Sequence, residues 1–146
     1  MTPFPCRLPK TLDDKLAYLE GRVRKDPKFT YEIIVVSDGS KDDTAGVTLK
    51  YSEKVGTDKI RLLKLVRNRG KGGAVVQGVM RARGKMVVFA DADGATQVSD
   101  VEKLEASAQK IQKNELAVSV GSRHHLVKTE AVVKVWTHFP HRSCFF

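Results

Sequence analysis

Apolar residues along the chain follow two spacings in turn, one typical of helices and one typical of strands. A first stripe recurs at helical spacing, at Leu12, Leu16, Leu19 and Val23. Thr11 to Asp14 fits a variant of the capping box, which predicts a helix start there, and Pro27 predicts the end of the helix. The next apolar run, Tyr31 to Ser37, is rich in β-branched residues and predicts a strand buried on both faces.

Helical and strand-like segments keep alternating along the rest of the chain. Further helices are predicted over Thr44 to Val55, over Gly73 to Arg83, and after the S-x-x-E capping box of Ser99 and Glu102. Further strands are predicted over Ile60 to Val66, Met86 to Ala90 and Leu116 to Val120. Such alternation with short connections predicts one α/β domain, a mostly parallel sheet with helices on both faces.

The composition agrees with one globular domain. The chain has 146 residues, of which 41% are hydrophobic and 29% charged, and this balance argues against disorder. Its apolar runs are strand-sized, far below the roughly 20 residues that span a bilayer, and no signal peptide is readable. Cys6 and Cys144 lie near opposite ends and predict neither a disulfide framework nor a zinc site.

Positive charge is concentrated in one segment of a chain whose net charge is +9. Between residues 61 and 85 there is no acidic residue, and the basic ones are Arg61, Lys64, Arg67, Arg69, Lys71, Arg81, Arg83 and Lys85. A positive field of this kind favours partners that carry phosphate, although solvated surface explains many of these side chains equally well. No aromatic residue interleaves the segment, which argues against nucleic acid as the partner.

A polar, turn-forming motif follows each predicted strand. The motifs are Ser37 to Ser40, Arg67 to Gly73, Asp91 to Gly94, and Gly121 to His125. Because parallel strands present their carboxyl ends to the same edge of a sheet, we expect the motifs to form one site there. Turn chemistry alone explains any single motif, but it explains all of them together poorly.

Asp91 and Asp93 are the sharpest chemical signal in the sequence. Their side chains leave a strand in the same direction, and two neighbouring carboxylates repel each other unless a cation lies near them. Oxygen ligands suit a hard divalent ion, Mg²⁺ or Mn²⁺, which keeps part of its shell for substrate phosphates. The pair therefore predicts a metal site with a catalytic role, and a plain D-x-D-G turn is the alternative.

The remaining motifs predict contacts with a nucleotide. Asp38 can accept hydrogen bonds from a base or ribose, or it can form a turn with Gly39 or cap the helix that follows. Gly72 and its neighbouring glycines let the backbone approach a phosphate, while Arg69 and Lys71 supply charge. Arg123, together with His124 and His125, can bind a second anion. A simple strand-to-helix turn remains the alternative for the glycine-rich stretch.

The order of these motifs resembles the family 2 glycosyltransferases that act on dolichyl phosphate. The quoted stretches are VVSDGSKDDT (35–44), LVRNRGKGGA (65–74), ADADGAT (90–96), DVEKLE (100–105) and GSRHHL (121–126). The likeness covers residues 7–134, which we expect to be a partial glycosyltransferase domain, with 135–146 a divergent tail. It implies the GT-A fold, with Asp38 contacting the nucleotide, Asp91 and Asp93 binding metal and diphosphate, and Arg69 and Lys71 lining the donor site.

The resemblance also implies a reaction and a place. The reaction is an inverting, metal-dependent transfer of glucose from UDP-glucose to dolichyl phosphate. The place is the cytosolic face of the endoplasmic reticulum membrane, where the product supplies glucose for protein N-glycosylation. Such enzymes open with a membrane anchor and a strand that this sequence lacks, so we expect a chain truncated at both ends, with one strand left as an unpaired edge. A non-catalytic module that binds nucleotide sugar is the alternative.

Overall fold

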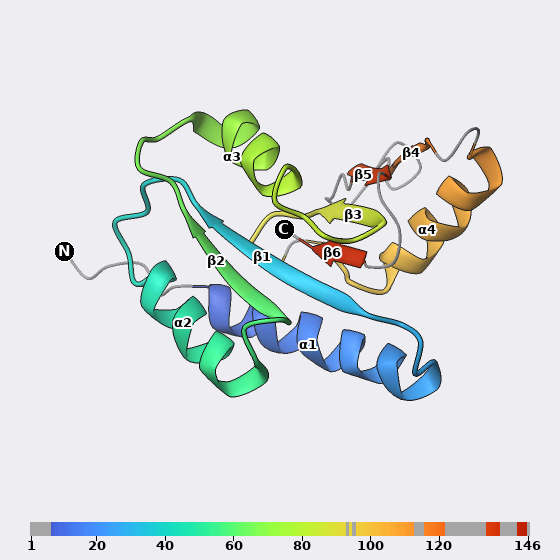
Figure 1. The fold of residues 1–146 in the computed structure, drawn as a ribbon, viewed down its shortest axis with the longest axis horizontal. Coiled ribbons are helices and arrows are strands. Elements are labelled where there is room, and N and C mark those ends of the chain that lie inside the picture. The colour runs from blue at the N-terminus through green and yellow to red at the C-terminus, as the bar shows by residue number, and fades with distance from the viewer. Residues whose placement is uncertain are drawn as a thin grey trace, which may run out of the picture.

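The computed structural model describes residues 7–92, 94, 96–112, 116–121, 134–137 and 143–145, the last two ranges by their backbone alone. The helices are α1 (Leu8–Lys25), α2 (Thr44–Val55), α3 (Gly70–Val79) and α4 (Asp100–Ile111). The strands are β1 (Tyr31–Ser37), β2 (Ile60–Lys64), β3 (Met86–Phe89), β4 (Val118–Val120), β5 (Lys134–Thr137) and β6 (Ser143–Phe145). Figure 1 shows α1 and α2 on one side of β1 and β2, with α3 on the other. The predicted α/β fold is confirmed.

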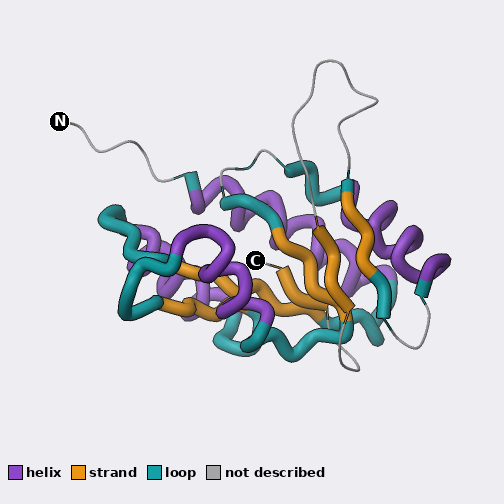
Figure 2. The backbone as a smooth tube through the Cα atoms, turned by 90° about the horizontal axis from the view of Figure 1, so that it is seen from above, coloured by secondary structure: helices purple, strands orange, loops and turns teal. Residues whose placement is uncertain are grey.

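The strands form one sheet in the order β2-β1-β6-β3-β5-β4 (Figure 2, strands in orange). The pairs β1–β2, β1–β6 and β3–β6 are parallel, whereas β5 runs antiparallel to both β3 and β4. The sheet is therefore mixed, because β5 is antiparallel to its neighbours, whereas β6 adds a parallel strand. Both strands lie largely in the segment 135–146 that the sequence suggested was a tail.

The expectation that one strand is left as an unpaired edge does not hold along the first part of β1. The backbone of β6 pairs with Tyr31–Ile33 on one side and with Met86–Val88 on the other, so it occupies the place between β1 and β3. On the opposite edge of β1, Ile33 donates its N–H to Lys59 and Ser37 accepts the N–H of Leu65. In a parallel ladder, successive residues direct their backbone hydrogen-bonding groups to opposite sides. The odd-numbered residues of β1 therefore hydrogen-bond to β2, and the even-numbered residues face the β6 side.

Two helix starts differ from the prediction. α1 begins at Leu8 rather than after a capping box at Thr11: its N-cap is Arg7, without a side-chain cap, and a proline in the first turn fits the fixed φ there. α3 begins at Gly70, where the N–H of Gly70 donates to the side chain of Asn68, three residues before the predicted start.

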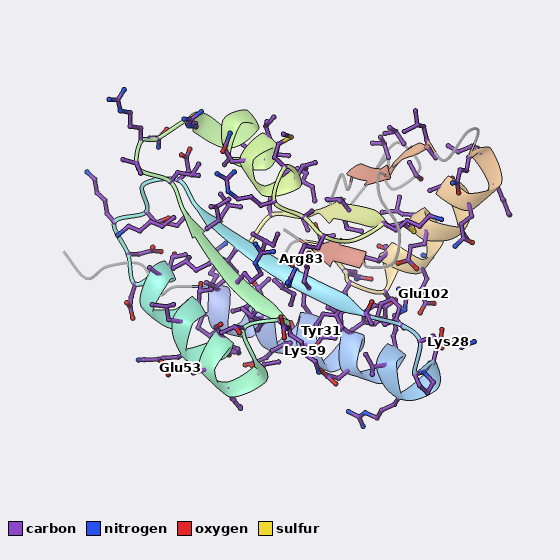
Figure 3. The ribbon with its side chains drawn as sticks, in the orientation of Figure 1. Lys28, Tyr31, Glu53, Lys59, Arg83 and Glu102 are labelled. Carbon is purple, nitrogen blue, oxygen red and sulfur yellow. The ribbon has the colours of Figure 1, made fainter. Side chains whose placement is uncertain are left out.

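α3 also ends earlier than predicted. It stops at Val79 rather than at Arg83. The N–H groups of Arg81 and Ala82 donate only three residues back, and the N–H of Arg83 donates to the carboxylate of Glu32 and not to a helical carbonyl. Glu32 lies on β1 with no exposed side-chain surface, and it also pairs with the guanidinium of Arg61 at 2.8 Å. A buried carboxylate needs such partners to offset its loss of hydration. Figure 3 shows Arg83 beside β1.

The core lies between α1 and the centre of the sheet. Leu12 and Leu19 on α1 pack with Ile33 of β1 and Val88 of β3, each at most 2% exposed. Burying one such side chain contributes about 1.5–3 kcal/mol. α1 is joined to α4 by the ion pair of Arg22 with Glu105 at 2.8 Å. In the described part of the chain, none of the helices is both long and apolar enough to cross a bilayer.

Candidate functional site at the carboxyl ends of the strands

Hydrogen bonds join the turn after β1 to the turn after β2. The side-chain amide of Asn68 donates to the backbone carbonyl of Asp38 at 2.8 Å, and the backbone N–H of Arg69 donates to the carboxylate of Asp38 at 2.7 Å. The predicted meeting of these two motifs at one edge of the sheet is therefore confirmed.

The bond to Arg69 also changes the interpretation of Asp38. This aspartate does not cap the helix that follows it, because the N-cap of α2 is Asp43. Instead it binds the N-cap residue of α3, which comes from the neighbouring strand. One carboxylate oxygen of Asp38 thus positions the glycine-rich turn. The predicted contact with a nucleotide would use the other oxygen.

The turn after β3 joins the same group through Lys71. The ammonium of Lys71, on the first turn of α3, lies 2.8 Å from one carboxylate oxygen of Asp91 and 2.9 Å from the other. It also lies 5.5 Å from the centre of the Phe89 ring, a cation–π distance. The Lys71 and Asp91 side chains are 67% and 50% exposed, so water screens the pair.

Of the two predicted metal ligands, Asp91 lies among the described residues, and its carboxylate is of the type that binds a divalent ion. Both carboxylate oxygens of Asp91 contact the positively charged ammonium of Lys71. Carboxylate oxygens are also the ligands that Mg²⁺ and Mn²⁺ prefer. No three His, Cys, Asp or Glu side chains gather into a metal-binding group within the described ranges. Asp93 and Arg123 lie outside the described residues, so their predicted roles stay predictions.

A pocket of about 170 Å³ opens beside Asp91. Its walls come from α1, β1, α3 and the end of β3, and they include Leu12, Lys15, Val36, Lys71, Ala74 and Asp91. Helices on opposite sides of the sheet line one pocket, next to the part of β1 past Ile33, where the described residues of β6 no longer pair with it. Lys15 is only 6% exposed there.

Thr11 ties α1 to the turn that carries Asp91. Its hydroxyl donates to the carbonyl of Ala92 at 3.1 Å and lies as close to the carbonyl of Arg7. The turn is completed by Gly94, whose φ of +79° favours glycine and whose added Cβ would lie 3.3 Å from the Thr11 hydroxyl. A buried hydroxyl on α1 thus positions the predicted metal turn.

Two adjacent glycines at the start of α3 meet different surroundings. A Cβ added to Gly73 would lie 2.5 Å from the Cβ of Arg69, so only glycine fits there. A Cβ added to Gly72 would meet no atom within 4 Å. The backbone at Gly72 is therefore open to an approaching ligand, at a helix N-terminus that favours anions.

Thr11 and Lys15 were missed by the motif search, although the sequence contains a signal for both. The buried positions of α1 are Leu8, Thr11, Leu12, Lys15 and Leu19. Two polar residues therefore fall on the apolar face of a helix, where they need polar partners. The leucine stripe predicts the buried face of this helix but does not indicate that Thr11 and Lys15 lie on it.

Comparisons with known proteins identify the family. Residues 7–138 match the family model described as Glycosyl transferase family 2. The chain is 53% identical to the dolichyl-phosphate beta-glucosyltransferase of Homo sapiens over 124 residues, which are 84% of this chain and 38% of that protein. It is 50% identical to the enzyme of that name from Dictyostelium discoideum over 128 residues, 88% of this chain and 39% of the relative.

A more distant relative of the same name, from Saccharomyces cerevisiae, is 42% identical over 133 residues, 84% of this chain and 39% of the relative. The chain thus spans well under half the length of these relatives. No solved structure matches it. The family match extends over most of the chain and takes in all three turns that meet at the edge of the sheet. The chain belongs to glycosyl transferase family 2.

Proposed function

We propose that this chain forms the donor-binding part of a glucosyltransferase that transfers glucose from UDP-glucose to dolichyl phosphate. The observation that carries the proposal is the convergence of three turns, through the Asp38–Arg69 and Lys71–Asp91 contacts, beside an open helix N-terminus. Relatives up to 54% identical are dolichyl-phosphate beta-glucosyltransferases, which supports the substrate class.

Each residue at this edge has a role in the proposal. Asp38 contacts the nucleoside with the oxygen that Arg69 does not use. Arg69, Lys71 and the open backbone at Gly72 receive the diphosphate, and Arg123 adds a further positive charge. Asp91 and Asp93 bind Mg²⁺ or Mn²⁺.

The chemistry follows from these charges. When the bond between the anomeric carbon of glucose and the diphosphate breaks, negative charge grows on the departing UDP, and Lys71 and Arg69 neutralise it. Asp91 and Asp93 would hold a divalent ion, which would supply Lewis-acid stabilisation of the leaving diphosphate. The acceptor phosphate has a second pKa near ~6, so it is mostly a dianion at neutral pH and attacks without a protein base. One displacement at the anomeric carbon inverts its configuration.

The acceptor also sets the location in this proposal. Dolichyl phosphate is a membrane lipid, so the chain works at a membrane surface, the cytosolic face of the endoplasmic reticulum. The product there feeds the lipid-linked oligosaccharide used in protein N-glycosylation. The excess of basic residues in segment 61–85 suits an anionic surface and a phosphate-bearing acceptor.

A second candidate function is binding of the nucleotide sugar without transfer. The observation that favours it is that the described contacts between the turns all concern the donor side. The two candidates differ in whether an acceptor is turned over, and not in the donor site.

A transfer assay separates them. The purified chain is incubated with UDP-glucose labelled in the sugar, dolichyl phosphate in detergent, and Mn²⁺, and the label is counted in the lipid extract. Label in a lipid with a β-linked glucose, absent with chelator, supports the transferase. Donor binding in a parallel calorimetric titration, with no lipid label, supports the binding module instead, and absence of both contradicts the proposal.

A further inference from the structure

Lys71 and Asp91 form an ion pair between two elements that the proposed reaction uses separately. Lys71 belongs to the turn assigned to the donor diphosphate, and Asp91 belongs to the turn assigned to the metal. The ammonium contacts both carboxylate oxygens, at 2.8 and 2.9 Å. The ammonium therefore occupies the position next to Asp91 that a bound metal cation would take.

The exposure of this ion pair allows another cation to replace Lys71 at Asp91. Both side chains are at least half exposed, whereas the carboxylate of Glu32, paired with Arg61 and Arg83, has no exposed surface. Water competes for an exposed ion pair and weakens it, while a buried pair cannot separate without leaving a charge unsolvated. A divalent ion can thus displace Lys71 from Asp91, but nothing in solution can readily displace the arginines from Glu32.

The turn that carries Lys71 also offers a place where an anion could bind and become the alternative partner of the ammonium. Lys71 precedes Gly72, where the surroundings of the backbone are open, and the first turn of α3 carries the positive end of the helix. A diphosphate received there offers the ammonium several oxygens and two or more negative charges, against the single charge of Asp91. The same lysine side chain cannot fully satisfy both anions.

We propose that Lys71 is an exchangeable counter-ion that couples the two ligands of the site. In the empty site it neutralises Asp91, and when donor binds it moves to the diphosphate and leaves Asp91 to the divalent ion. This inference rests on the proposed function. Because the lysine opposes the metal in the empty site and favours the donor, its loss has opposite effects on the two affinities, and each ligand raises the affinity for the other.

The test is Mn²⁺ binding without any donor, measured from the electron paramagnetic resonance signal of free Mn²⁺. The variant is Lys71→Met, and the control is Lys54→Met, which removes the same charge from an exposed lysine near the end of α2. We expect Lys71→Met to bind Mn²⁺ about two- to fivefold more tightly than the parent, the range that an exposed ion pair supplies, and the control to match the parent. Equal or weaker binding by Lys71→Met overturns the inference.

Donor binding then tests the second half of the exchange. With saturating Mn²⁺, we expect the affinity of Lys71→Met for UDP-glucose to fall about tenfold, because a charge-assisted contact is lost, and Lys71→Arg to retain most of it. Unchanged donor affinity overturns the transfer of Lys71 to the diphosphate. A parent chain that binds UDP-glucose but no Mn²⁺ overturns the metal site itself, a failure of the proposed function that differs from both earlier results.

Discussion

The carboxylate of Asp38 accepts a hydrogen bond from the backbone N–H of Arg69 at 2.7 Å, across the ends of two neighbouring strands. This bond positions the start of α3, so Asp38 has a structural role beside any contact with a nucleotide. We predict that Asp38→Ala lowers the free energy of unfolding by about 0.5–1.5 kcal/mol, the usual worth of one hydrogen bond. Urea denaturation followed by circular dichroism measures it.

Asp38→Asn separates the two roles. Its amide oxygen still accepts the N–H of Arg69, but its side chain carries no charge. We predict parent-like stability with weaker binding of UDP-glucose. If Asp38→Ala were as stable as the parent, the structural role of the bond would be refuted, and if Asp38→Asn bound the donor normally, the nucleotide would not need the carboxylate.

Gly72 and Gly73 give a matched pair of substitutions. Gly72→Ala places a methyl group in open space on the first turn of α3, so we predict a gain of about 0.5–1 kcal/mol in stability together with weaker donor binding. Gly73→Ala forces its Cβ against that of Arg69 and should cost about 1–3 kcal/mol. Thermal denaturation and donor titration measure both effects. A Gly72→Ala chain with normal donor affinity argues against a phosphate at this backbone.

Thr11 should matter for the metal turn although it lies on α1. Thr11→Val keeps the shape of the side chain but removes the hydroxyl that donates to the carbonyl of Ala92. We predict a loss of about 1–3 kcal/mol in stability, the cost of an unpaired buried polar group, and weaker Mn²⁺ binding. Thr11→Ser, which keeps the hydroxyl, should restore Mn²⁺ binding. Weak binding in both variants would mean that the hydrogen bond is not the cause.

Glu20 provides a test of pH dependence away from the site. The pKa of Glu20 is lowered from its ordinary 4.5, first by the hydrogen bond from Lys59 and then by that from Tyr31. Figure 3 shows Tyr31 and Lys59 next to each other. Because the pKa is lower in the folded chain, the ionised carboxylate stabilises the fold above the unfolded pKa, and this contribution is lost as the pH falls through the folded pKa.

We therefore predict that the parent loses stability more steeply than Glu20→Gln as the pH falls from about 5 towards about 3. Urea denaturation at a series of pH values measures the two slopes. Identical slopes would show that the contacts of Glu20 with Lys59 and Tyr31 do not persist in solution.

The sequence predicted the order of helices and strands well, because apolar periodicity is a local property. The bounds of β1 and α2 agree with the prediction, since a β-branched run and a helical stretch ended by Gly56 are unambiguous. The ends of α3 differed because they depend on particular hydrogen bonds, to the side chain of Asn68 two residues before the helix and to the distant Glu32 after it. Periodicity carries no information about such contacts.

The site was predictable in outline but not in its connections. Parallel topology alone brings three of the motifs to one edge of the sheet. That Asp38 binds Arg69, and that Lys71 binds Asp91, depends on the spacing of the strands and on where α3 begins. The place of β6 between β1 and β3 was not foreseen, because three residues at the end of the chain carry no strand pattern strong enough to assign them to the middle of a sheet.

The central claim is that these turns form a metal-dependent donor site, and a calorimetric titration of the purified chain with UDP-glucose tests it most directly. The titration is run with Mn²⁺ and with chelator, with GDP-mannose as the competing donor and Asp91→Ala as the variant. We predict binding that requires Mn²⁺, that is selective for UDP-glucose, and that is lost in Asp91→Ala while the variant stays folded. UDP-glucose binding of equal strength in Asp91→Ala and the parent, with Mn²⁺ present, would contradict the account.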